Sequence, residues 1–267
     1  MSITFPCKFV SFYRTHPNLP GANVIARLSP STKFHSIDGF FNYANQNQGK
    51  NIVILFRHGS VDLSNGEGAC FGKFYGENVV LNYGGETQIK NLGELFKGRI
   101  VIPHSTLFTS PLQRTVESGN LFVEASGLKM DETKKLEELK EIDIGRFLNS
   151  TLNFIKKPLK ASITALELTS LVLRWIDNPE KISFPEGESI PNIWTRISFA
   201  AGEISEASGK GIVYVSGHEI TNRLLVAKLL GLDLSTCRKS PPLNPGGFIA
   251  INAETKEILY AHNIKGL

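Results

Sequence analysis

Two short apolar segments of the chain each lead to a histidine, His58 in the first and His218 in the second. Residues 52–56 are all apolar and are followed at once by Arg57 and His58, whereas residues 212–215 lead through Ser-Gly to His218. A histidine side chain can act as a nucleophile that forms a covalent intermediate. An arginine side chain binds phosphoryl oxygens in pairs through its planar guanidinium group. The combination indicates an anion site with an imidazole at its centre.

A second guanidinium group, that of Arg114, follows another predicted strand, near residues 106–109. The segment after this strand has the signals of a helix start, with Ser110 as the N-cap, Pro111 in the first turn and Gln113 at the capping-box position. Arg114 then falls in the first turn of the helix. Two imidazoles and two guanidinium groups at one edge of a sheet need an anion to balance them, and a phosphoryl group fits best.

The elements that must position these side chains are readable from the apolar pattern. A continuous apolar run such as residues 52–56 is typical of a strand that is buried on both faces. Open α/β sheets bind their ligands at the carboxyl ends of such strands. Strands that alternate with helices predict a mainly parallel sheet with helices on both faces, and the chain closes on a predicted hairpin around residues 253–256. Helical spacing is found in residues 85–97, 110–126, about 161–177, 190–207 and 220–230.

Four motifs resemble, in the same order, those of the histidine phosphatase (phosphoglycerate mutase-like) superfamily: RHG at 57–59, SPLQRTVES at 110–118, LKEIDIGRF at 139–147 and VSGHE at 215–219. The resemblance covers roughly residues 50–255. It implies an α/β fold, a three-layer α/β/α sandwich with a mainly parallel central sheet. It also implies that His58 is the phosphorylated nucleophile and that Arg57, Arg114 and His218 bind the phosphate.

The resemblance leaves two candidates for the proton donor. Glu141 lies four residues before Gly145, as in the L-x-E-x-x-x-G pattern of the family. Glu219 follows His218 directly and is similar to the aspartate of the His-Asp pair in the acid phosphatase and phytase branch. Glu219 also begins a predicted helix, whose N-terminus favours the ionised carboxylate. We therefore expect Glu141 to be the donor, with Glu219 as the alternative. A further stretch, PEGES at 185–189, resembles the Gly-Gly-Glu-Ser turn of the family, which implies a structural or phosphate-adjacent role.

The chain departs from the family pattern at three places, one of which is the last motif, where the family usually has Ser-His-Gly and this chain has Ser-Gly-His-Glu at residues 216–219. Family members commonly continue RHG with Glu-Thr and then an Asn, whereas this chain has Ser60, Val61 and Ser64. They usually continue the third motif with Trp-Glu-Gly, whereas this chain has FLN at residues 147–149. The segments expected to select the substrate are residues 60–83, residues 146–160 and the N-terminal extension.

The predicted reaction is two-step hydrolysis of a phosphomonoester of a small metabolite through a phosphohistidine. One alternative is a phosphoglycerate mutase-type phosphotransferase, although mutases carry a longer Asn-Glu-Arg-Tyr-Gly type stretch in place of LKEIDIGRF. Another is a non-catalytic regulatory protein that binds a phosphorylated ligand and has lost the donor. No cofactor is expected. No metal is expected either, because no histidine or carboxylate cluster has ligand spacing.

Composition and charge set the remaining expectations. The net charge of +4 is spread along the chain without a Lys/Arg block, so no nucleic-acid partner is expected. No apolar run is long enough to cross a bilayer, and three scattered cysteines are typical of reduced thiols in a cytoplasm. Residues 1–49 are rich in aromatic side chains and are predicted to be an extension packed on a main domain of residues 50–267. The oligomeric state stays open.

Overall fold

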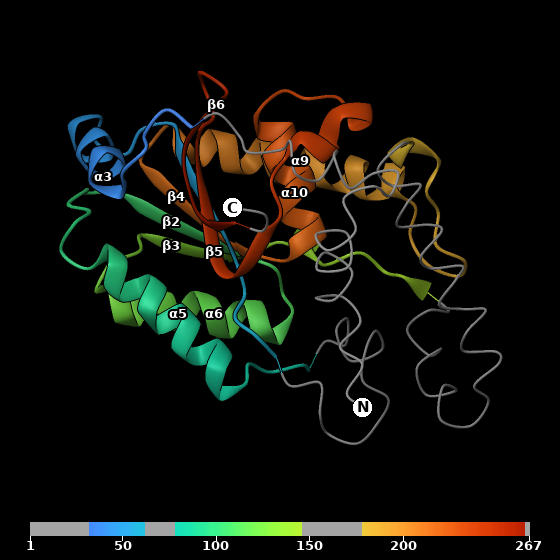
Figure 1. The fold of residues 1–267 in the computed structure, drawn as a ribbon, viewed down its shortest axis with the longest axis horizontal. Coiled ribbons are helices and arrows are strands. Elements are labelled where there is room, and N and C mark those ends of the chain that lie inside the picture. The colour runs from blue at the N-terminus through green and yellow to red at the C-terminus, as the bar shows by residue number, and fades with distance from the viewer. Residues whose placement is uncertain (1–31, 62–77, 146–177, 265–267) are drawn as a thin grey trace, which may run out of the picture.

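The computed structural model describes residues 32–61, 78–145 and 178–264, and its centre is a mixed six-stranded sheet in the order β3-β2-β4-β1-β5-β6 (Figure 1). Strands β1 to β4 run parallel, β5 is antiparallel to β1, and β6 is antiparallel to β5. The strands are β1 (Ile52–Arg57), β2 (Ser105–Thr109), β3 (Glu132–Lys135), β4 (Ile212–Gly217), β5 (Leu243–Asn252) and β6 (Glu257–Ile264).

Helices cover both faces of the sheet, as Figure 1 shows, with α5 and α6 on one face and α9 and α10 on the other. Each face has its own cluster of buried apolar side chains, so the sheet is the middle of three layers. This confirms the predicted α/β/α sandwich. The helices are α3 (Ile37–Gln46), α5 (Tyr83–Phe96), α6 (Gln113–Ser126), α9 (Ile190–Ser208) and α10 (Glu219–Leu229), with short 3-10 turns at Glu137–Leu139, Pro179–Lys181 and Leu234–Lys239.

The central strands are buried as their sequences predict. In β1 the first five residues are fully buried, and all six residues of β4 are buried. Because these two strands are neighbours and run parallel, their carboxyl ends lie at the same edge of the sheet. The sequence-based prediction of two buried strands that deliver one histidine each is therefore confirmed.

The described part of the N-terminal region packs against the C-terminal hairpin. Lys33 and Phe34 donate backbone hydrogen bonds to the carbonyl oxygens of Ile258 and Leu259 in β6. Within the same layer, aromatic side chains of α3 join the apolar cluster beneath α5 and α6. The predicted division of the chain into residues 1–49 and 50–267 stays a prediction, since residues 1–31 lie outside the described part.

The structure corrects the predicted start of the second helix. Helix α6 begins at Gln113, its N-cap position is Leu112, and no side chain caps its N-terminus. The predicted N-cap, Ser110, instead contacts His218.

The predicted helix at about 161–177 and most of the segment 60–83 lie outside the described residues. Within the described residues, no helix has both the length and the apolar composition that crossing a membrane would need.

Candidate active site

The candidate site lies where the carboxyl ends of three parallel strands meet. Arg57 at the end of β1 is in register with Gly217 at the end of β4, and the N–H of His58 donates to the carbonyl of Gly217 at 3.0 Å. Beside them, the N–H of Ser110, directly after β2, donates to the carbonyl of Ser216 at 3.2 Å. These backbone contacts bring the first, second and fourth sequence motifs together.

His58 is buried, and one of its ring nitrogens is committed to the backbone. Nδ1 lies 2.7 Å from the carbonyl oxygen of Gly59. A carbonyl oxygen can only accept a hydrogen bond, so Nδ1 carries the proton and Nε2 keeps its lone pair. Burial, followed by the charges of Arg57 and Arg114, lowers the pKa of His58 well below its ordinary value. The ring is therefore a neutral imidazole with a nucleophilic Nε2.

Gly59 allows the loop after His58 to pass close to helix α5. A Cβ atom at this position would collide with the backbone carbonyl of Gly85 near the start of that helix. The N–H of Gly59 donates to the hydroxyl of Ser118 on α6 at 3.2 Å, and that hydroxyl donates to the carbonyl of Arg114 at 2.7 Å. Helices α5 and α6, which lie on the same face of the sheet, thus hold the backbone that orients His58.

His218 is fully buried next to His58, with ring centroids 5.3 Å apart and an interplanar angle of 66°. Its Nε2 lies 2.9 Å from the hydroxyl oxygen of Ser110. Its Nδ1 is buried and has no hydrogen-bond partner among the described residues. Burial and the charge of Arg114 are the two largest causes that lower the pKa of His218 well below its ordinary value. Both histidines are therefore neutral near pH 7.

The two arginines bring positive charge to both imidazoles. Arg114, in the first turn of α6, is the largest fully buried side chain in the described part of the structure. Arg57 is oriented through Nη1, which donates to the carbonyl of Leu243 at 3.0 Å and lies 2.7 Å from a carboxylate oxygen of Glu219. Its Nε is buried and has no hydrogen-bond partner among the described residues. The four predicted anion-binding and nucleophilic side chains are therefore gathered at one place.

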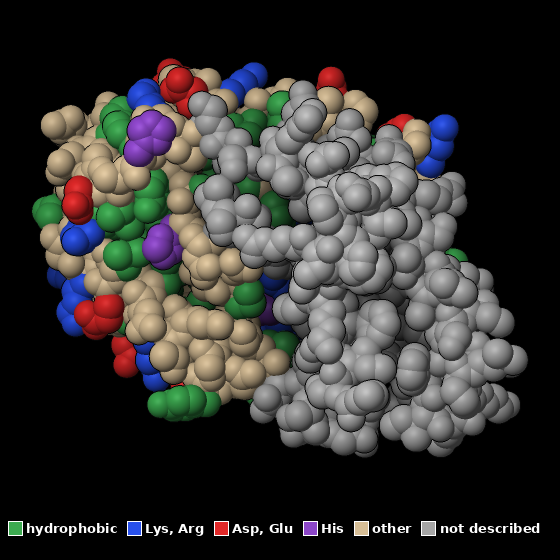
Figure 2. All heavy atoms as spheres, in the orientation of Figure 1, with side chains coloured by type: hydrophobic (Ala, Val, Ile, Leu, Met, Phe, Trp, Pro, Cys, Tyr) green, Lys and Arg blue, Asp and Glu red, His purple; other side chains and the backbone are tan. Residues whose placement is uncertain are grey.

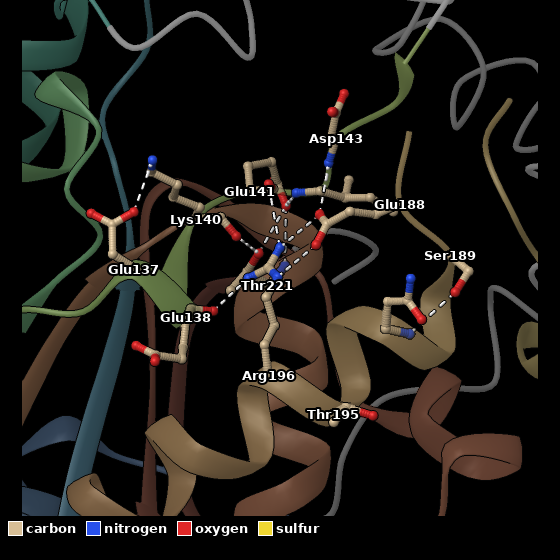
Figure 3. Close-up of polar contacts among 12 residues, drawn as sticks. Glu137, Glu138, Lys140, Glu141, Asp143, Glu188, Ser189, Thr195, Arg196 and Thr221 are labelled. Atoms are coloured by element: carbon tan, nitrogen blue, oxygen red, sulfur yellow. Dashed lines mark hydrogen bonds and ion pairs between the residues drawn. The ribbon is translucent and has the colours of Figure 1, made fainter. Parts of the chain in front are cut away.

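Glu141 reaches the same region from the segment after β3, but it lies at the N-terminus of α10. Its carboxylate accepts hydrogen bonds from the N–H groups of Ile220 at 3.3 Å and Thr221 at 3.2 Å. It also lies 3.0 Å from the hydroxyl of Thr221 and 3.0 Å from its neighbour's N–H, that of Ile142 (Figure 3). These are the positions of a carboxylate that caps a helix N-terminus. All four partners are neutral groups.

A salt bridge between Arg196 and Glu188 holds the segment that carries Glu141. Nε and Nη2 of Arg196 lie 2.8 Å and 3.0 Å from the two carboxylate oxygens of Glu188. The same guanidinium group donates to the backbone carbonyls of Glu138 and Glu141, and Glu188 accepts from the N–H of Asp143 at 2.9 Å (Figure 3). Glu188, the second glutamate of the PEGES turn, therefore has a structural role in this part of the protein.

Glu219, the alternative donor, lies between two guanidinium groups. Besides its contact with Arg57, it interacts electrostatically with Arg223 on the next turn of α10, where it partly offsets the lowering of the Arg223 pKa by burial. The Nε of Arg223 donates to the carbonyl of Ser240 at 3.2 Å. Glu219 is therefore the counter-ion of a cationic pair at the edge of the site.

Several residues at the site were not identified as functional from the sequence. Ser110 was expected to cap a helix, Arg196 carried no motif, and the amide of Asn222, which donates to the carbonyl of Phe56 at 3.0 Å, gave no signal. Each acts through a contact with residues far away in the chain. The sequence could have indicated Ser110 as a site residue through its position inside the second motif.

Among the described residues, no cluster of three or more histidine, cysteine or carboxylate side chains could hold a metal ion.

On the face in Figure 2, acidic and basic side chains of the described residues are interspersed, and no single-sign stripe crosses it. The positive charge of the site itself is buried, since Arg114 is fully buried and the Arg57 side chain is 11% exposed.

Comparison with known proteins supplies the family. The profile of the histidine phosphatase superfamily (branch 1) matches residues 53–259. Phosphoserine phosphatase 1 of Hydrogenobacter thermophilus is 26% identical over 129 residues, a match of 48% of this chain and 56% of that protein. The chain thus spans about half the length of this curated relative.

Solved structures agree with this fold. A putative alpha-ribazole-5'-P phosphatase from Escherichia coli is similar with a TM-score of 0.58 and 19% identity, covering 80% of this chain and 95% of that one. A mycobacterial glucosyl-3-phosphoglycerate phosphatase is similar with a TM-score of 0.57 and 18% identity, covering 80% of this chain and 97% of that one. The family profile spans all four motifs that form the site. The chain belongs to the histidine phosphatase superfamily.

Proposed function

We propose that the protein hydrolyses phosphomonoesters in two steps, through a phosphohistidine at His58. The observation that carries this proposal is the state of His58, a buried neutral ring whose Nδ1–H is bound to the carbonyl of Gly59. Its Nε2 lone pair is then available to attack phosphorus. The surrounding charges of Arg57 and Arg114 would stabilise the phosphoryl oxygens as charge develops on them.

The proposed steps balance as follows. In the first step, Nε2 of His58 forms the N–P bond, the P–O bond to the leaving group breaks, and the leaving oxygen takes a proton from an acid. In the second step, a water oxygen attacks phosphorus and the N–P bond breaks, while the same residue, now a carboxylate, takes a proton from the water. The products are an alcohol and inorganic phosphate. Arg57, Arg114 and His218 bind the phosphoryl group throughout.

Glu141 is the proposed acid. An acid must be protonated before it can donate, and a neighbouring cation opposes protonation of a carboxylate. Both carboxylates lie at the N-terminus of α10, so the helix end does not distinguish them. Glu219 in addition lies 2.7 Å from the Arg57 guanidinium group and interacts with Arg223, whereas the hydrogen-bond partners of Glu141 among the described residues are neutral N–H and hydroxyl groups. This difference supports Glu141 as the donor and leaves Glu219 as the alternative.

The proposed substrate is a small phosphorylated metabolite. The proteins to which the chain is similar are named for phosphoserine, an alpha-ribazole phosphate and glucosyl-3-phosphoglycerate, all of them small phosphoesters. The site described above recognises the phosphoryl group that such molecules share. The proposal therefore names the class of substrate, and a panel of phosphorylated metabolites is the experiment that identifies the individual compound.

The nucleophile is tested by His58→Gln. We expect turnover to fall to the background of the assay while the far-ultraviolet circular dichroism spectrum is unchanged, because no other described side chain lies where His58 does. In the wild-type protein, rapid quenching should trap an acid-labile, base-stable phosphoenzyme in stoichiometric amount. His104→Gln, at an exposed histidine bonded to Asp131, is the matched control and should retain full activity.

Turnover close to the wild-type rate in His58→Gln would contradict the proposal. The same preparation separates the two alternatives. A mutase-type phosphotransferase would transfer the phosphoryl group of the phosphoenzyme to a hydroxylated acceptor faster than to water. A non-catalytic binding protein would bind inorganic phosphate or vanadate without forming the phosphoenzyme.

A further inference from the structure

Ser110 is a fully buried serine whose backbone and side chain are both fixed. Its N–H donates to the carbonyl of Ser216, and its own carbonyl accepts from the hydroxyl of Thr115 at 2.9 Å. The Ser110 hydroxyl oxygen accepts from the N–H of Leu112 at 3.3 Å and lies 2.9 Å from Nε2 of His218. The hydroxyl group therefore has a defined position against one edge of the His218 ring.

The direction of the hydrogen bond between Ser110 and His218 follows from counting donors and acceptors. The Ser110 oxygen already accepts from Leu112, and among the described residues its other hydrogen-bond partner is Nε2 of His218. If Nε2 donated to the oxygen, the hydroxyl proton of this buried serine would have no acceptor among the described residues, and an unsatisfied buried donor is destabilising. Donation from the hydroxyl to the Nε2 lone pair satisfies both groups.

The direction of this hydrogen bond also assigns the other ring nitrogen. Nδ1 of His218 is buried and has no partner among the described residues, and the charges that act on the ring come from Arg114, Arg57, Arg196 and the neighbouring His58. Because the ring stays neutral near pH 7, it carries a single proton. With Nε2 as the acceptor, that proton resides on Nδ1. An Nδ1–H group can donate to a phosphoryl oxygen, whereas an Nδ1 lone pair would repel it.

We propose that Ser110 is a positioning residue, which donates its hydroxyl proton to Nε2 of His218 and thereby keeps the proton of this neutral imidazole on Nδ1, where it binds the phosphoryl group. The assignment of the phosphoryl group as the ligand of Nδ1 rests on the proposed function, but the assignment of the tautomer does not. Ser110 itself does not touch the phosphoryl group and acts only through His218.

The test is a tautomer measurement on Ser110→Ala. Protein labelled with ¹⁵N-histidine is studied at neutral pH by two-bond proton–nitrogen correlation spectra, in which the protonated and unprotonated ring nitrogens are distinguished. The His218 signals are assigned as those missing from His218→Gln. We expect the wild-type protein to hold His218 as the Nδ1–H tautomer, and Ser110→Ala to hold a mixture or the Nε2–H tautomer. Ser126→Ala, at a buried serine at the end of α6, should leave the spectrum unchanged.

Kinetics give a second readout. With a weakened Nδ1–H donor, Ser110→Ala should lose about 100-fold to 1,000-fold in kcat/KM, the range for one preorganised donor. The loss should be equal for alkyl and aryl phosphates, because the phosphoryl group and not the leaving group is affected. Ser110→Thr keeps the hydroxyl and should keep the Nδ1–H tautomer. If the alanine variant does not fold, the tautomer of the wild-type protein still tests the inference.

A wild-type His218 in the Nε2–H tautomer, or a Ser110→Ala protein that keeps the Nδ1–H tautomer, would overturn the inference. The tautomer result also separates this inference from the proposed function. If His218 changes tautomer as expected but the wild-type protein forms no phosphoenzyme, the role of Ser110 stands and the proposed reaction falls. If phosphoenzyme forms and the tautomer does not depend on Ser110, the reverse holds.

Discussion

At the scale of single residues, the two glutamates of the site differ in the charge of their partners. Glu219 is bound by a guanidinium group at 2.7 Å, and Glu141 is bound by backbone N–H groups and a hydroxyl. A residue that protonates the leaving group matters most when that group is a poor one. This difference allows the roles of the two carboxylates to be separated by the choice of substrate.

We predict that Glu141→Gln loses roughly 100-fold or more in kcat on an alkyl phosphate, the scale of general acid catalysis. On an aryl phosphate, whose leaving group needs little protonation, the loss should be far smaller. Glu219→Gln should affect both esters equally, because it removes the counter-ion that orients Arg57. Steady-state kinetics on the two esters decide the question. A selective loss on the alkyl ester in Glu219→Gln instead would transfer the donor role to Glu219.

The residue types of the site were readable from the sequence, but their contacts were not. Local sequence is enough to place the four side chains at or just after the ends of strands, where open sheets bind ligands. These are Arg57, His58, Arg114 and His218. Ser110 was assigned to a helix cap because capping preferences are local. Its actual partner is 108 residues away in the chain, and no local pattern encodes such a contact.

At the scale of elements, the segment after β3 is held in place by α9. Arg196 of α9 binds Glu188 through two nitrogens and also donates to backbone carbonyls of that segment. The Glu141 carboxylate in turn caps α10, the helix that directly follows His218. The relative position of the proposed donor and the imidazole pair therefore depends on the contact between two helices and a turn.

We predict that Arg196→Lys reduces kcat on an alkyl phosphate by roughly 10-fold to 100-fold, because a lysine cannot bind both carboxylate oxygens in a fork and a small displacement of a catalytic group is costly. The loss should be smaller on an aryl phosphate, as for Glu141→Gln. The matched control is Arg99→Lys, at the exposed pair with Asp38, which should leave both rates unchanged. Equal losses on the two esters would show that Arg196 only supports the fold.

The elements themselves were largely predictable, with errors at their ends. Continuous apolar runs identified β1 and β4, since a strand buried on both faces has no polar alternation. The hairpin around residues 253–256 was predicted, but not where its first strand begins. Strand β5 begins at Leu243 and includes Pro245, which normally interrupts a strand, and the pairing with β6 shifts register between Leu243 and Phe248. A bulge of this kind accommodates a proline but leaves no periodic signal.

At the scale of the whole molecule, the fold buries two neutral imidazoles, and their protonation destabilises the folded state. The pKa of His58 and that of His218 are both lowered in the folded protein, and an unfolded chain has histidines of pKa about 6.5. Below that pH the unfolded state binds more protons than the folded state. Stability is therefore complete above about pH 6.5 and is lost as the pH falls from there through the folded pKa values.

We predict that the free energy of unfolding in urea falls between about pH 6.5 and pH 5.5, with a contribution on the order of 1 kcal/mol per pH unit from each of the two histidines. His58→Gln should show a shallower dependence, because one imidazole no longer titrates. The measurement is made in buffer without phosphate, which would bind the folded state. A stability that is independent of pH in this window, or an equal slope in both proteins, would contradict the prediction.

The order of strands at the centre of the sheet has a consequence for the size of the site. His58 and His218 each stand one residue beyond a register pair of β1 and β4, and neighbouring strands lie about 4.8 Å apart. The 5.3 Å between the two imidazole centroids is therefore close to a single step of the backbone ladder. In the proposed reaction this spacing would serve the phosphoryl group, and the rest of the substrate would be recognised elsewhere on the protein.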